Sequence, residues 1–103
     1  MIDTIEININ NGILPQVSAF IVYKDKICYM NDRKYFVDDL FLKQLKDIIY
    51  TFKHEYGISQ QIDAEEFTIK VYSQGVEDVY HGKGVFPANY AIFKRLLGDI
   101  YGR

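Results

Sequence analysis

The sequence predicts an α+β domain, with a mainly antiparallel five-stranded sheet, two helices packed on one face, and the order β-β-β-α-β-β-α. Short segments rich in alternating apolar residues predict the strands, at 2–9, 16–23, 26–30, 67–72 and 76–80. Two longer segments, near 38–56 and 87–102, instead repeat apolar residues with the 3.6-residue period of a helix. Two helices and several hairpin strands can close a two-layer core, so this order favours α+β.

The 103 residues fit a single domain, 1–103, that is large enough to bury a core without a disulfide or a metal. The net charge of −2 is spread evenly along the chain, which argues against strong non-specific binding to nucleic acid. The lone Cys28 cannot form an intramolecular disulfide, and its apolar neighbours predict a buried thiol. With no signal-like N-terminus and no apolar segment of membrane-spanning length, we expect a cytoplasmic protein without membrane contacts.

The first half of the chain predicts a hairpin sheet that leads into a helix. The segment 2–9 alternates isoleucines with polar residues, and Asn11-Gly12 is a strong signal for a hairpin turn. The apolar segment 16–23 predicts a central strand, and 26–30 predicts the strand that returns beside it. Residues 31–34 are polar and predict a turn.

The first helix is predicted from residue 38 to residue 56. Asp38 and Asp39 occupy its first turn, where the helix dipole favours acids, and Gly57 suits the position just after a helix. The apolar stripe comprises Phe41, Leu45, Ile48, Ile49, Phe52 and Tyr56. We expect 58–64 to be a linker.

The second helix is predicted to begin at Pro87, because proline is favoured in the first turn of a helix, and to end near Gly102. Its expected buried face consists of Ile92, Phe93, Leu96 and Ile100.

An internal repeat is a further hypothesis. Residues 29–50 laid on 80–101 give five identities: Tyr29/Tyr80, Lys43/Lys94, Leu45/Leu96, Ile49/Ile100 and Tyr50/Tyr101. The repeat would consist of two ββα units, 16–57 and 65–103, sharing one antiparallel sheet. The alternative is that two amphipathic helices share apolar spacing without a common unit.

The segment 80–90 raises the question of a ligand site. Its His81-Gly82-Lys83-Gly84 sequence precedes a predicted helix start, where backbone amides can bind an anion, and His81, Lys83 and Asn89 are the candidate ligand-binding residues. The spacing fits neither a phosphate-binding P-loop nor a dinucleotide-binding glycine motif. The alternative is that the glycines permit a bulge or a positive φ where the chain leaves the sheet.

Catalysis and metal binding receive no support from the sequence. The chain has two histidines and one cysteine, with none of the spacings typical of zinc ligands, so we expect no metal and no cofactor. Adjacent acids such as Asp38-Asp39 and Glu65-Glu66 diverge on helices and strands and form no acid/base pair. An enzyme is therefore the less favoured class.

Four tyrosines near the hairpin turns, Tyr23, Tyr29, Tyr72 and Tyr80, are the candidate partner-binding residues. On the face away from the helices they would form an aromatic surface suited to a protein partner or to self-association. The alternative is cross-strand pairing that only stabilises the sheet.

We therefore expect a small non-enzymatic binding protein, acting as a dimer or with a protein partner. The alternatives are a small-ligand or anion-binding domain that uses the 80–90 segment, and a nucleic-acid-associated accessory protein.

Overall fold

The computed structural model describes residues 1–11, 14–60 and 64–102 and has the predicted α+β class. The strands are β1 (Thr4–Asn11), β2 (Leu14–Val22), β3 (Ile27–Met30), β4 (Arg33–Phe36), β5 (Glu55–Ile58), β6 (Glu65–Ser73) and β7 (Val76–Lys83). The helices are α1 (Asp39–Ile49) and α2 (Tyr90–Gly98), and α2 continues into a 3-10 turn, η1 (Asp99–Gly102).

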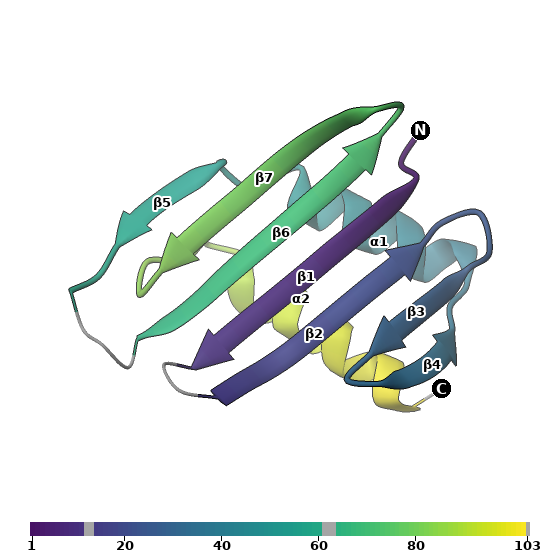
Figure 1. Ribbon diagram of the computed structural model, residues 1–103, viewed down its shortest axis with the longest axis horizontal. Helices are drawn as coiled ribbons and strands as arrows, with labels where there is room; N and C mark the ends of the chain where they lie inside the picture. Colours follow the sequence, from purple (N-terminus) through teal and green to yellow (C-terminus); the bar gives the residue numbers. More distant parts are fainter. Residues whose placement is uncertain (12–13, 61–63, 103) are drawn as a thin grey trace.

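The described residues form one seven-stranded sheet in the order β4-β3-β2-β1-β6-β7-β5. Its neighbouring strands are antiparallel, except that β5 runs parallel to β7. The prediction of five strands is therefore wrong in detail, because the sheet contains two more strands, one at each edge. The first strand of the chain, β1, lies at the centre between β2 and β6 (Figure 1).

The predicted polar turn at 31–34 is confirmed at Asn31 and Asp32, whereas residues 33 and 34 begin strand β4. Asn31 and Asp32 adopt positive φ values of 48° and 67°, which turn the chain between β3 and β4. The Asn31 Oδ1 accepts a hydrogen bond of 2.9 Å from the Ser18 amide and fixes this turn to β2. Edge strands carry charged side chains because one of their sides faces water, so Arg33–Phe36 lacks the apolar alternation that identifies a strand.

Helix α1 begins as predicted but ends at Ile49, not at residue 56. Asp38 is its N-cap, and its Oδ1 accepts a hydrogen bond of 2.8 Å from the Phe41 amide. Phe52 is buried beyond the helix end, where its ring meets Phe93 edge-on with centroids 5.6 Å apart. The apolar spacing thus continues past the helix because Phe52, in the segment that connects α1 to β5, also enters the core.

The predicted helix end at Gly57 is wrong, and of the predicted linker at 58–64 only Ile58 belongs to a strand, whereas residues 59, 60 and 64 lie outside helices and strands as predicted. Gly57 has a φ of 88°, but it lies within β5, which occupies Glu55–Ile58. Residues 61–63 of the predicted linker lie outside the described residues, as does Gly12 of the predicted Asn11-Gly12 turn.

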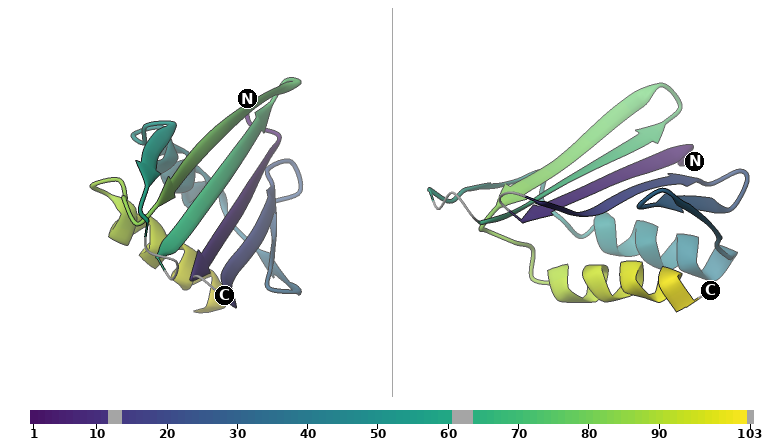
Figure 2. Two further views of the ribbon diagram at one scale, coloured as in Figure 1. Left: turned by 60° about the vertical axis from the view of Figure 1, so that its left-hand side comes forward. Right: turned by 60° about the horizontal axis from the view of Figure 1, so that its bottom comes forward.

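Both helices cover the same face of the sheet and leave the other face open (Figures 1 and 2). The helix-facing apolar residues of β1 and β6 are fully buried, as the alternation predicts, and Cys28 of β3 is buried with them. The largest fully buried side chains are Phe41, Phe67, Phe93, Ile5, Ile7, Ile9, Ile21, Met30, Leu45, Ile49, Ile69 and Ile100. None of the helices in the described part of the chain is long and apolar enough to cross a membrane.

Helix α2 buries part of the predicted face. It begins at Tyr90, three residues after Pro87, and Phe93 and Ile100 are fully buried, as predicted. Leu96 is only partly buried against the core, and Ile92 is half exposed. The buried stripe instead includes Tyr90 and Leu97, and its spacings of three, four and three leave Ile92 on the exposed side.

The aligned residues of the proposed ββα repeat agree in burial at some positions and differ at others. Ile49 and Ile100 are both fully buried, whereas Tyr29 is exposed and its aligned partner Tyr80 is buried. Phe41 is fully buried, whereas its aligned partner Ile92 is half exposed. Burial alone therefore neither supports nor contradicts a repeated unit.

Candidate functional site

The segment 80–90 is mostly strand and turn, and its first four residues complete β7. A Cβ atom on Gly82 would lie 2.5 Å from the Val85 oxygen and 2.7 Å from the Phe67 ring. Gly84 has a φ of 71°, and its amide donates to the Glu65 carbonyl at 2.9 Å. Packing and backbone conformation thus account for both glycines.

The candidate ligand residues lie on two sides of the sheet. The side chains of His81 and Lys83 belong to the open face, because their cross-strand partners Thr68 and Glu66 alternate with the buried residues of β6. Asn89 is exposed and immediately precedes α2 on the covered side, and its side chain makes no capping hydrogen bond. The structure therefore brings His81 and Lys83 to one face but does not add Asn89 to them.

His81 is held between two carboxylates. Its Nδ1 lies 3.0 Å from Glu55 Oε1, and its Nε2 lies 2.7 Å from Glu66 Oε2. The hydrogen bonds to Glu66 and then to Glu55 raise the pKa of His81 above its ordinary value, although partial burial opposes the shift. Two acids beside the imidazole disfavour an added anion there, because the anion would meet carboxylates already in place.

A second polar cluster lies where β6 begins, on the side of α2. Glu65 Oε2 accepts a hydrogen bond of 2.6 Å from the Tyr90 hydroxyl. Glu65 Oε1 forms an ion pair with Lys94 Nζ, which lies 3.0 Å away. Burial, followed by this hydrogen bond, raises the pKa of Tyr90. The cluster joins α2 to the sheet and leaves each member with a partner.

The four candidate tyrosines are divided between the two faces. The Tyr23 hydroxyl donates a hydrogen bond of 3.0 Å to the Leu42 carbonyl of α1. Tyr80 is buried and stacks on the His54 ring, with centroids 4.6 Å apart. Only Tyr29 and Tyr72 lie on the open face, so the expected surface of four tyrosines does not form.

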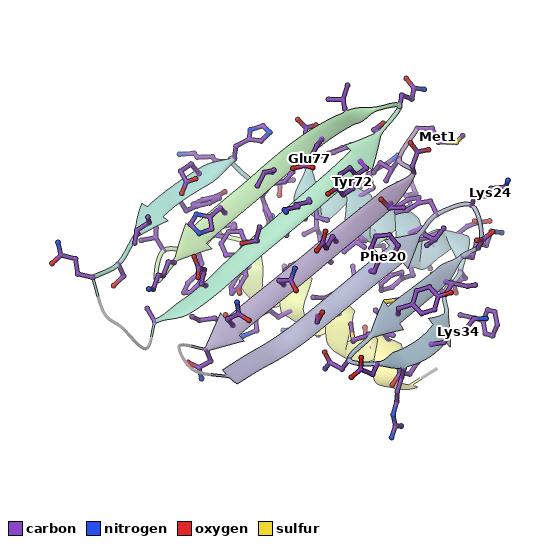
Figure 3. The ribbon with its side chains drawn as sticks, in the orientation of Figure 1. Met1, Phe20, Lys24, Lys34, Tyr72 and Glu77 are labelled. Carbon is purple, nitrogen blue, oxygen red and sulfur yellow. The ribbon has the colours of Figure 1, made fainter. Side chains whose placement is uncertain are left out.

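Tyr72 already has an intramolecular partner. It is the cross-strand neighbour of Glu77, and Figure 3 shows both side chains on the open face. A hydrogen bond to Glu77 is the main cause that raises the pKa of the Tyr72 phenol. This tyrosine therefore fits the sheet-stabilising alternative.

Tyr29 instead belongs to a cluster that the sequence analysis missed. We define the open-face patch as the outward side chains of β2, β3 and β4, namely Phe20, Val22, Ile27, Tyr29, Lys34 and Phe36. Phe20, Tyr29 and Phe36 are exposed by 40%, 45% and 69%. A hollow of about 310 Å³, lined in part by Phe20 and Tyr29, adjoins it. The available signal was Phe20, an aromatic residue at the outward parity between the buried Ala19 and Ile21.

The described residues contain no group of three or more His, Cys, Asp or Glu side chains that could hold a metal ion. The Cys28 thiol is fully buried, and burial raises its pKa to about 11.

Comparison with known proteins gives no relative of this chain: no family model, no curated protein and no solved structure matches it significantly. The functional argument therefore depends on the site geometry alone.

Proposed function

We propose that the protein is a small non-enzymatic binding protein whose open-face patch contacts a second copy of the chain. The observation that carries this proposal is the exposure of three aromatic rings on one end of a sheet face that no helix covers. Aromatic rings provide large contact areas at a low cost in conformational entropy, which makes them frequent centres of protein interfaces.

A row of four cross-strand neighbours within this region favours a second copy as the partner. Glu6 on β1 neighbours Phe20, Phe20 neighbours Tyr29, and Tyr29 neighbours Lys34 on β4. The row therefore runs acid, aromatic, aromatic, base across four strands. A two-fold axis parallel to the strands, through the centre of this row, would place each Glu6 opposite the other copy's Lys34.

The same axis would place Phe20 opposite the other copy's Tyr29. Such an arrangement is self-complementary, as a two-fold interface requires. It would bury the aromatic rings and keep the charged pair at the rim, where ion pairs favour one register over another.

The axis would pair strands β1 to β4 of one copy with the same four strands of the other, because β4 is the edge of the sheet. Strands β6, β7 and β5 would lie outside the contact. The interface would therefore be smaller than the roughly 800 Å² per partner of a standard one, as in weak complexes that form at high protein concentration.

Charge reversal with mixing tests the proposal sharply. In Glu6→Lys, two lysines would meet at each rim contact, and in Lys34→Glu, two glutamates would meet. We expect sedimentation velocity to show a dimer for the wild type and mainly monomer for each variant. An equal mixture of the two variants should recover a heterodimer, because every rim contact again pairs an acid with a base.

The matched control is Tyr50→Ala, which removes a half-exposed aromatic ring outside the open-face patch and should leave the dimer intact. Phe20→Ala should dissociate the dimer without loss of the fold. A wild type that sediments as a monomer up to millimolar concentration would refute self-association. Sedimentation of both charge-reversal variants as dimers would refute this interface.

A further inference from the structure

Most residues of edge strand β5 are exposed. Its parallel pairing with β7 is irregular, with Glu55 beside His81 and Ile58 beside Lys83. The backbone bonds that flank the pairing run from the His81 amide to the His54 carbonyl at 2.9 Å and from the Ser59 amide to the Lys83 carbonyl at 2.7 Å. The imidazole of His81 on β7 also contacts the side chains of Glu55 on β5 and Glu66 on β6, so it links these three strands.

The two distances determine which form of the ring fits. A neutral imidazole has one N–H donor and one bare nitrogen, whereas an imidazolium has two donors. Both ring nitrogens of His81 lie within hydrogen-bond distance of an ionised oxygen, at 3.0 Å and 2.7 Å. Only the protonated ring can donate to both carboxylates, because a neutral ring would turn a lone pair toward one of them.

Glu55 is the partner that loses its hydrogen bond on deprotonation. Its contact is the longer one, and its side chain is 62% exposed, against 39% for Glu66. A neutral ring with its proton on Nε2 keeps the shorter bond to Glu66, and Glu55 can turn into water.

We propose that His81 is a pH-dependent clamp, which holds β5 on the sheet while its ring is protonated and releases Glu55 when the proton leaves. The proposal concerns the end of the sheet opposite the open-face patch and does not depend on self-association.

The surroundings of the ring support this assignment. From β6, Thr68 and Glu66 face His81, and on β7 itself Lys83 lies two residues further along the same face. Lys83 is the cross-strand neighbour of Glu66. The element that precedes β5 contributes the His54 carbonyl, which the His81 amide already engages.

The direction of the pH dependence follows from linkage. The two carboxylates raise the pKa of His81 in the folded protein above its ordinary value of about 6.5. The clamp therefore contributes fully below about pH 6.5 and is lost as the pH rises through the raised folded pKa.

Amide hydrogen exchange, expressed as protection relative to intrinsic rates, tests the clamp. The reporter is the Ser59 amide, whose acceptor is on β7, and the control is the Gly84 amide, which bonds to the Glu65 carbonyl on β6. We expect protection at Ser59 to fall roughly threefold to tenfold as His81 titrates, the range for a partly exposed charged hydrogen bond. Protection at Gly84 should not follow this titration.

Glu55→Gln is the decisive variant, because a carboxamide can accept from a protonated ring and donate to a neutral one. Ser59 should then stay protected on both sides of the titration, and the His81 pKa measured from its imidazole NMR signals should fall. His81→Gln should remove the pH dependence as well. A wild-type protein whose Ser59 protection does not change across the His81 titration would overturn the clamp. An equal change in Glu55→Gln would also overturn it.

Discussion

Replacing Gly82 with alanine tests whether this glycine serves packing rather than ligand binding. The added Cβ would lie 2.5 Å from the Val85 oxygen, 2.7 Å from the Phe67 ring and 3.0 Å from the Tyr56 Cβ. The first neighbour is backbone and the second belongs to a fully buried ring, so neither can move away freely. Overpacking a core typically costs 1–3 kcal/mol, and two such contacts predict about 2–3 kcal/mol.

Thermal unfolding followed by circular dichroism measures this cost. A domain of this size loses about 5 °C in melting temperature per kcal/mol, so Gly82→Ala should melt about 10–15 °C below the wild type. Gly98→Ala is the matched control, since its Cβ meets nothing within 4 Å. This control should be neutral, or stabilising by up to about 1 kcal/mol, because alanine is the better helix former.

A double-mutant cycle identifies the contact responsible. Phe67→Leu alone should destabilise the protein by leaving a cavity. In the Gly82→Ala background the same substitution should cost less, because the smaller side chain makes room for the new methyl group. A Gly82→Ala protein with the melting temperature of the wild type would refute the packing argument.

Three further predictions follow from single contacts. Asp38→Ala removes the N-cap bond to Phe41 and should cost about 1 kcal/mol in urea unfolding, whereas Asp38→Asn should retain most of it; equal losses would contradict the capping role. Tyr90→Phe removes the donor to Glu65 and should cost about 1–2 kcal/mol by the same measurement, and no loss would show that the bond contributes nothing. Cys28 should react with a thiol reagent only on unfolding, because burial raises its pKa to about 11; rapid labelling of the native protein would contradict this burial.

The parts of the fold that the sequence predicts are those with one buried and one exposed face. The alternation in β1 and β6 separates helix-facing isoleucines and phenylalanine from polar residues, and the structure buries those side chains completely. The start of α1 was predictable for a similar local reason, since Asp38 caps the helix with its own side chain. In each case the signal and its structural cause lie within a few residues of each other.

The two edge strands lack such a local signal. β4 and β5 have four residues each, and water reaches one side of both, so they show no apolar alternation. Their pairing is fixed by tertiary contacts, which a local pattern does not encode. The contact of His81 with Glu55 depends on the parallel pairing of β5 with β7, so this carboxylate partner could not be predicted.

The sheet order also explains why the apparent repeat does not correspond to a repeated unit. β2 and β6 run in the same direction, because each is antiparallel to β1, and both turn the same face toward the helices. In the sheet, β3 lies on one side of β2, and β7 lies on the opposite side of β6. If β2 is superposed on β6 with the helices kept on the same face, β3 therefore falls on β1 and not on β7. The two ββα units therefore have opposite hands, and no rotation superposes them. The shared spacing of apolar residues in α1 and α2 then reflects the common requirement of a helix packed on a sheet, and duplication of a ββα unit is not needed to explain it.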